Sequence, residues 1–220
     1  MPAKNRIKEY EENSFYHIYN RGVERRRIFI DQQDYSVFLS YLKFYLLTPV
    51  QNGPKVPPSH KLKNYFGGIT LLCYCLMPNH FHLLIHQRSE ADMTEFMRSL
   101  LTRYSMYFNR KYQRVGSLFQ GRYKAVKVTS EQQLVYLSHY IHRNPHPSGT
   151  DPEGWVGYHY SSLPNYLGKI KQDWVVPDRI LDLFSRIDRS GSYFSFVSDS
   201  AIQPDSSVTL ADTSGTDPEG

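Results

Sequence analysis

Residues 69–86 read ITLLCYCLMPNHFHLLIH, and this stretch decides the fold. One apolar run ends at Pro78-Asn79, and a second apolar run begins directly after that pair. Two short apolar runs joined by a turn are typical of an antiparallel hairpin. The sequence therefore predicts strands over about 69–76 and 80–86.

The flanking sequence predicts further elements on both sides of this hairpin. Apolar residues at helical spacing indicate helices, and alternating or β-branched runs indicate strands. Asp31 is suited to cap the first helix, and Asn144-Pro145 to end the last one. The elements expected are a strand at 14–20, a helix at 32–47, a helix at 92–112, a strand at 122–129 and a helix at 131–143. This β-α-β-β-α-β-α order predicts an α+β fold, an antiparallel sheet with helices packed on one side.

The chain divides into one domain and a tail. We expect a single domain over 1–190, with a Pro-rich insertion loop at 49–66 and an irregular extension at 146–190 that holds a short helix near 177–187. Residues 191–220 are rich in Ser, Asp, Thr, Pro and Gly, and they contain no Lys or Arg. Such a composition predicts a disordered acidic tail.

The charge of the domain points to an anionic partner. The whole chain has a formal net charge of +5. Because five of the 21 acidic residues lie in 191–220, the first 190 residues carry 26 basic and 16 acidic side chains. A surplus of this size favours binding to a polyanion such as nucleic acid.

Cysteine content and hydropathy indicate the cellular compartment in which the protein is expected. Cys73 and Cys75 alternate with Tyr74, so both are expected on one face of a strand as buried, reduced thiols. No run of about 20 apolar residues occurs, and the first residues lack the apolar stretch of a signal peptide. The sequence therefore predicts a cytoplasmic protein with no membrane partner.

Two pairs of residues are candidates for chemistry. His80 and His82 share one face of their strand, so both imidazoles could bind one metal ion, although such pairs also occur in ordinary strands. Tyr140 and Asn144 are four residues apart on a helix and therefore neighbours, which fits either packing or a shared site.

Basic residues are concentrated between 98 and 127. The segment itself contains no acidic residue, and Glu95 just before it is the one nearby counter-charge in the sequence. The cations together therefore suggest a phosphate-binding surface. They are Arg98, Arg103, Arg110, Lys111, Arg114, Arg122, Lys124 and Lys127.

Several blocks resemble a known family in the family's own order. MPNHFHLLI at 77–85 resembles the HUH motif of single-tyrosine transposases of insertion-sequence 200/605 type, and it is most similar to the REP-associated tyrosine transposases. YHIYNRG at 16–22, LFQGRYKA at 118–125 and YIHRNP at 140–145 also match, as do YSS at 160–162 and YLG at 166–168. The resemblance covers about residues 14–187.

The resemblance implies an HUH-type domain of ferredoxin-like or RRM-like order, with a metal-dependent transesterase activity. Tyr140 matches the family's nucleophile, and His80 and His82 match its metal ligands. Asn144 lies where the family places a third ligand, carried on a helix. Mg²⁺ or Mn²⁺ suits phosphoryl chemistry with such ligands.

The same resemblance implies a substrate of single-stranded DNA with hairpins, cut through a 5′-phosphotyrosine and then rejoined. The candidate DNA-binding residues are Arg21, Arg25, Arg26, Arg27, Arg103, Arg110, Arg122 and Lys124. His17 fits either a partner of the metal ligands or a core histidine. Some relatives act as dimers, so a homodimer is one expectation.

Three alternatives stay open, and one departure is visible. The chain could be a module that binds hairpins without cutting, or a metal-dependent nuclease that uses water and does not need Tyr140. An RNA-binding protein is a third alternative, although the aromatic pair of RNP-type strands is missing. After Asn144-Pro145 the family continues with small apolar residues, whereas this chain has HPSG at 146–149.

Overall fold

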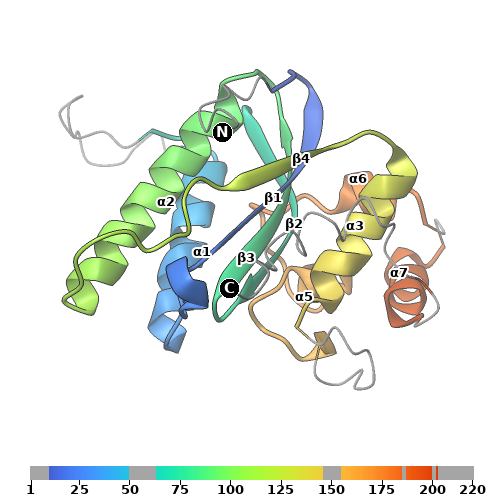
Figure 1. Ribbon diagram of the computed structural model, residues 1–220. Helices are drawn as coiled ribbons and strands as arrows, with labels where there is room; N and C mark the ends of the chain where they lie inside the picture. The colour runs from blue at the N-terminus through green and yellow to red at the C-terminus, as the bar shows by residue number, and fades with distance from the viewer. Residues whose placement is uncertain (1–9, 50–62, 146–154, 185–186, 200–201, 203–220) are drawn as a thin grey trace, which may run out of the picture.

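The computed structural model describes residues 10–49, 63–145, 155–184, 187–199 and 202. Its first part follows the predicted β-α-β-β-α-β-α order and confirms the α+β fold (Figure 1). The elements are β1 (Ser14–Arg21), the short 3-10 turn η1 (Val23–Arg25), α1 (Gln32–Leu46), β2 (Ile69–Met77), β3 (His80–Gln87), α2 (Asp92–Lys111), β4 (Lys124–Val128) and α3 (Glu131–Arg143).

The four strands form one antiparallel sheet in the order β2-β3-β1-β4. β2 and β3 form the predicted hairpin, and a register shift between Leu71 and Cys73 marks a β-bulge. β1 lies between β3 and β4, with Tyr19 opposite His82 and Arg21 opposite His80. The histidine pair is therefore held in the middle of the sheet and not at a free edge.

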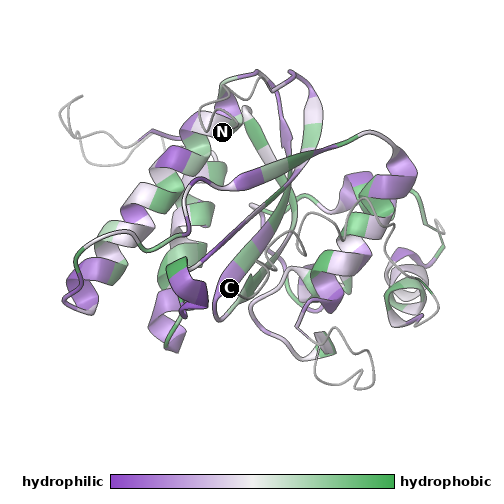
Figure 2. Ribbon diagram, in the orientation of Figure 1, coloured by the Kyte–Doolittle hydropathy of each residue, from purple (hydrophilic) through white to green (hydrophobic). Residues whose placement is uncertain are grey.

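Helices cover both faces of the sheet, so the expectation of helices on one side only was wrong. Phe81, Leu83 and Ile85 join the core beneath α1 and α2, whereas Leu84 joins a second core with α3. Figure 1 shows α1 and α2 on one side of the strands and α3 with α7 on the other. The physical reason is already in β2 and β3, which are apolar at nearly every position because both of their faces are buried (Figure 2).

The C-terminal extension adds α5 (Leu163–Tyr166), α6 (Asp178–Leu181) and α7 (Arg189–Ser198). The Leu76 N–H donates to the Tyr160 carbonyl, and the Ser162 N–H donates to the Tyr74 carbonyl. These bonds satisfy backbone groups at the edge of β2 that would otherwise be open to pairing with another strand.

Two boundaries expected from the sequence need correction. Helix α7 occupies part of the stretch expected to be a disordered tail, because Tyr193 and Val197 supply a buried apolar face. The short helix expected near 177–187 is the single turn of α6. Most of the Pro-rich insertion, at 50–62, and the tail from 203 lie outside the described residues.

A buried polar network attaches α7 to α3 and to the extension. The Nδ1 atom of His142 lies 2.7 Å from the Tyr193 hydroxyl, and its Nε2 atom lies 2.8 Å from the Ser162 hydroxyl. The Tyr193 hydroxyl also donates to Ser138. Because these groups are buried, losing one partner would leave another unsatisfied, which fixes the position of α3 over the sheet.

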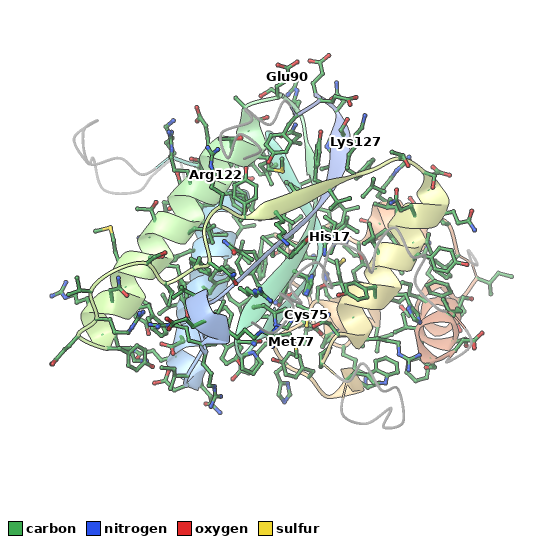
Figure 3. The ribbon with its side chains drawn as sticks, in the orientation of Figure 1. His17, Cys75, Met77, Glu90, Arg122 and Lys127 are labelled. Carbon is green, nitrogen blue, oxygen red and sulfur yellow. The ribbon has the colours of Figure 1, made fainter. Side chains whose placement is uncertain are left out.

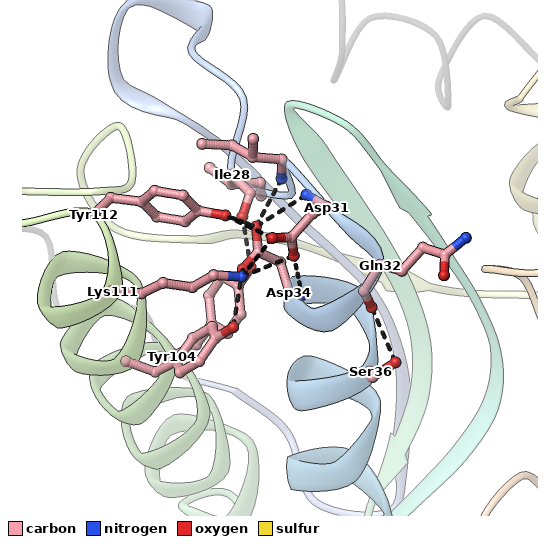
Figure 4. A network of polar contacts seen from close by, with 10 residues as sticks. Ile28, Asp31, Gln32, Asp34, Ser36, Tyr104, Lys111 and Tyr112 are labelled. Atoms are coloured by element: carbon pink, nitrogen blue, oxygen red, sulfur yellow. Dashed lines mark hydrogen bonds and ion pairs between the residues drawn. The ribbon is translucent and has the colours of Figure 1, made fainter.

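A second network joins the start of α1 to the end of α2 (Figure 4). Asp34 is fully buried and accepts hydrogen bonds from the Ile30 N–H, Lys111 and the hydroxyls of Tyr107 and Tyr112. Asp31 caps α1 as predicted, within a capping box, and pairs with Lys111 at 2.7 Å. Lys111 is therefore neutralised inside the protein and is not part of a phosphate-binding surface, which corrects the expectation from the sequence.

His139 on α3 predicts a loss of stability in acid. Its ring is 3% exposed, and neither ring nitrogen has a hydrogen-bond partner among the described residues. Burial, aided by Arg143 and opposed by Asp199, lowers the pKa of His139 from 6.5 to about 4. Between pH 6.5 and pH 4, His139 is therefore protonated in the unfolded chain and neutral in the folded chain. As the pH falls through this range, the unfolding free energy decreases by up to about 1.4 kcal/mol per pH unit.

Urea unfolding at pH 7.5 and pH 5.0 measures this effect. We expect His139→Leu, which keeps the packing against Phe196, to lose less stability than the wild type between the two pH values, by about 2 kcal/mol. His159 is exposed, so His159→Gln serves as the control and should behave as the wild type does. An equal loss in wild type and His139→Leu would show that His139 is not the group concerned.

Candidate active site between β3 and α3

The face of the sheet beneath α3 carries a cluster of histidine and tyrosine side chains. His80 and His82 alternate along β3, and His17 and Tyr19 alternate along β1, so all four point to one face. The ring centroids of His80 and His82 are 5.0 Å apart, and those of His17 and His82 are 5.1 Å apart. Figure 3 shows His17 in the middle of the sheet, toward α3.

Helix α3 brings the predicted tyrosine and asparagine to this cluster. Ser130 caps the helix, and Leu134, Leu137 and Ile141 bury one face of it against the sheet. Tyr140 sits half-buried at the margin of that face, with its ring centroid 5.5 Å from the ring of His82 at an interplanar angle of 90°. The structure thus brings Tyr140 close to His82, although the two are 58 residues apart in the chain.

Asn144 completes the group at the end of α3. Its Oδ1 atom lies 3.1 Å from Nε2 of His80, while Nδ1 of that same ring lies 2.7 Å from Oδ1 of Asn79. Both Oδ1 atoms are amide oxygens, and a neutral imidazole carries one proton, so the His80 ring can donate to only one of them. Predicted residues Tyr140, His80, His82 and Asn144 therefore all meet at one place.

The electrostatics of the site keep both imidazoles neutral. Burial, followed by the neighbouring rings of His17 and His80, lowers the pKa of His82 well below its usual value. Burial lowers the pKa of His80 as well, with the Asn144 contact opposing and Arg21 assisting. Neutral imidazole is the form that binds a metal ion, so neither ring must release a proton at pH 7 to act as a ligand.

One buried atom tests whether these residues fit a metal ion. The Nε2 atom of His82 is buried and has no hydrogen-bond partner in the described part of the chain, an arrangement that costs stability unless something else binds there. No group of three His, Cys, Asp or Glu side chains that could hold a metal occurs among the described residues. The residues that could hold a metal ion here are two imidazoles and one amide, those of His80, His82 and Asn144.

Some of the expected DNA-binding residues lie beside this cluster. Arg21 ends β1 directly opposite His80, and its Nε donates to the side chain of Gln120. Lys124 begins β4 opposite Tyr19, and its Nζ lies 5.6 Å from the centre of that ring. Arg122 is exposed in the segment just before β4. Arg21 and Lys124 come from separate strands that the sheet places on either side of the cluster, whereas Arg122 lies toward α2 (Figure 3).

The remaining expected cations are placed differently. Arg25 and Arg27 are exposed in and after η1, and Arg26 pairs with Glu24. Arg110 is exposed in the last turn of α2, on the opposite face of the sheet from α3.

Arg103 is not part of a DNA-binding surface. Its guanidinium carbon lies 4.3 Å from the ring centre of Tyr41 and 5.6 Å from that of Phe44, both on α1. Lys127 pairs with Glu11. Together with Lys111, these contacts show that the basic segment is divided over several surfaces. Spacing along the sequence could not reveal this, because the partners on α1 and near β1 are distant in the chain.

The sequence left the role of His17 open and did not single out Tyr19 or Asn79. His17 is 1% exposed, and its Nε2 atom lies 2.9 Å from Nδ1 of His82. The ring of Tyr19 stacks near that of His82, with centroids 5.9 Å apart. The alternation in SFYHIYN was the available signal, but the register between β1 and β3 was needed to read it.

Comparison with known proteins agrees with this geometry. Residues 60–144, which include β2, β3, α2, β4 and α3, match the family model described as Transposase IS200 like. The chain is therefore similar to IS200-like transposases over this segment. The matched segment contains the histidine pair, Tyr140 and Asn144.

One solved structure supports the fold. A REP-associated tyrosine transposase bound to a REP hairpin is similar with a TM-score of 0.51 and 12% identity, over 80% of this chain and 90% of that one. A protein described as a transposase from Deinococcus radiodurans gives a TM-score of 0.37 at 15% identity, over 62% and 95% of the two chains. That score is too low to carry an argument. No curated protein matches the chain.

None of the described helices is long and apolar enough to cross a membrane.

Proposed function

We propose that this protein is a transposase, a metal-dependent transesterase that cuts single-stranded DNA through Tyr140. The observation that supports the proposal best concerns the Nε2 atom of His82. This atom has no hydrogen-bond partner among the described residues, and the ring of His82 lies close to that of Tyr140. A ligand atom without a partner and a candidate nucleophile on facing elements are what a site for phosphoryl transfer needs. Within the proposal, the active domain is residues 1–190.

The chemistry is a displacement at phosphorus. The Tyr140 oxygen attacks the phosphodiester, the bond from phosphorus to the 3′-oxygen breaks, and that oxygen leaves as a 3′-hydroxyl after taking up a proton. The product is a 5′-phosphotyrosine, which a later 3′-hydroxyl attacks to rejoin strands. A tyrosine hydroxyl titrates near pH 10, so it is a weak nucleophile at pH 7 without help. Mg²⁺ or Mn²⁺ held by His80, His82 and Asn144 would polarise the phosphate and stabilise the charge that develops.

Single-stranded DNA with a hairpin is the proposed substrate. The REP-associated transposase of similar fold was solved with a hairpin bound, and here Arg21 and Lys124 flank the cluster. Cations at these places would contact phosphates and position the strand. We extend the proposed DNA contacts to the exposed turn after β1, that is, to Arg25, Arg26 and Arg27. The homodimer stays a prediction that light scattering can test.

A gel assay for covalent adducts tests the proposed function. Labelled hairpin oligonucleotides from the sequence that flanks the gene are incubated with the protein and Mn²⁺ or Mg²⁺, then denatured. We expect a protein–DNA adduct that survives denaturation, with the phosphate on Tyr140 when the peptide is mapped by mass spectrometry. EDTA should abolish the adduct, because without a divalent ion nothing at His80, His82 and Asn144 would polarise the phosphate that Tyr140 attacks.

Two results would contradict this mechanism. Cleavage without any adduct would favour a nuclease that uses water. Binding of the hairpin without cleavage in either metal ion would favour a non-cutting hairpin-binding module.

A further inference from the structure

The contact between His17 and His82 allows the shared proton to belong to either ring. Nε2 of His17 and Nδ1 of His82 are 2.9 Å apart, and both side chains are buried. Burial lowers the pKa of His17 to about 3, so its ring is neutral at pH 7. A hydrogen bond between two neutral imidazoles holds one proton, which belongs to one ring or the other.

The two possible arrangements have different consequences for His82. If His17 donates, Nδ1 of His82 is the acceptor, and the proton of His82 must sit on Nε2. That buried N–H would then have no acceptor among the described residues, and it could not bind a cation. If His82 donates from Nδ1, its Nε2 carries only a lone pair. That buried lone pair also has no partner among the described residues, but a bound cation would satisfy it.

We propose that His17 is a positioning residue that accepts the Nδ1–H of His82 and thereby keeps the Nε2 lone pair of His82 available to a divalent cation. This inference rests on the proposed function for its purpose. In metal sites, a partner on the second ring nitrogen commonly fixes the tautomer and the orientation of the ligand histidine. Asn79 makes the equivalent contact to Nδ1 of His80, so each imidazole of the pair has its own acceptor.

The tautomer of His82 can be measured in the metal-free protein, without DNA. Two-bond proton–nitrogen correlation spectra of ¹⁵N-histidine-labelled protein distinguish the two neutral tautomers, and His82→Leu identifies the His82 signals among the nine histidines. We expect the wild type to carry the His82 proton on Nδ1. A wild-type proton on Nε2 would overturn the proposal.

Substitution of His17 then tests the consequence for the cation. In His17→Gln the amide oxygen can still accept from His82, whereas in His17→Leu no acceptor is left. We expect His17→Leu to weaken Mn²⁺ binding, followed by the electron paramagnetic resonance signal of free Mn²⁺, by about 10–100-fold. His17→Gln should stay within about 3-fold of the wild type, because it keeps the acceptor. Equal Mn²⁺ affinity in His17→Leu and wild type would overturn the proposal.

The design separates this proposal from the proposed function. If His17→Leu fails to fold, the wild-type tautomer and the His17→Gln affinity still decide the matter. An absence of DNA adducts would overturn the transesterase and leave the tautomer result standing. Conversely, adduct formation by a wild type whose His82 carries its proton on Nε2 would support the enzyme and overturn the role of His17.

Discussion

Tyr140→Phe should abolish the DNA adduct and lower strand cutting by at least about 10³-fold, because the variant lacks the attacking oxygen. The ring would keep its edge contacts to His82 and His17. Since only a hydroxyl on a half-buried side chain is removed, the unfolding free energy should change by no more than about 1 kcal/mol. Single-turnover cutting of a labelled hairpin oligonucleotide and urea unfolding measure the two quantities.

Tyr136→Phe is the matched control on the same helix. Tyr136 lies one turn before Tyr140, and its ring centroid is 6.4 Å from that of Phe196 on α7. It contributes nothing to the proposed chemistry, so cutting should continue at the wild-type rate. If Tyr140→Phe also cuts normally, Tyr140 is not the nucleophile, and a hydrolytic nuclease becomes the better description.

Asp34→Ala should reduce the unfolding free energy by about 3–5 kcal/mol, the usual effect of removing one partner from a buried ion pair. Asp34 is fully buried, and its removal leaves the Ile30 N–H and the Tyr107 hydroxyl without this acceptor. Lys111 and Tyr112 would keep only their hydrogen bonds to Asp31. Burial raises the pKa of Asp34, but the hydrogen bonds from Ile30 and Lys111 outweigh burial and lower it overall. The carboxylate is therefore charged at neutral pH.

Asp31→Ala is the comparison for this prediction. Asp31 contacts the same Lys111, but half of its side chain is exposed, so water can replace its interactions. Urea unfolding at pH 7.5 should show a clearly smaller loss for Asp31→Ala than for Asp34→Ala. Equal losses would mean that the network acts through the cap of α1 and not through the buried carboxylate.

Local sequence patterns determined the elements of this protein. The apolar hairpin, the cap at Asp31 and the stop after Arg143 appear in the structure within one or two residues of the prediction. The alternation of His80 and His82 and the helical spacing of Tyr140 and Asn144 identified the members of the candidate site. These signals are readable because each depends on neighbours a few residues away in the chain.

Contacts between residues that are far apart in the sequence were decided only by the tertiary structure. The pairing of β1 with β3 determined that His17 meets His82, and the packing of α3 determined that Tyr140 lies over the histidines. Ion pairs with α1 and with the segment before β1 removed Lys111 and Lys127 from the basic surface. Burial of Tyr193 and Val197 turned part of an apparently disordered tail into a helix. Composition gives charge and hydropathy, but which groups neutralise or bury each other depends on contacts between residues that are far apart in the sequence.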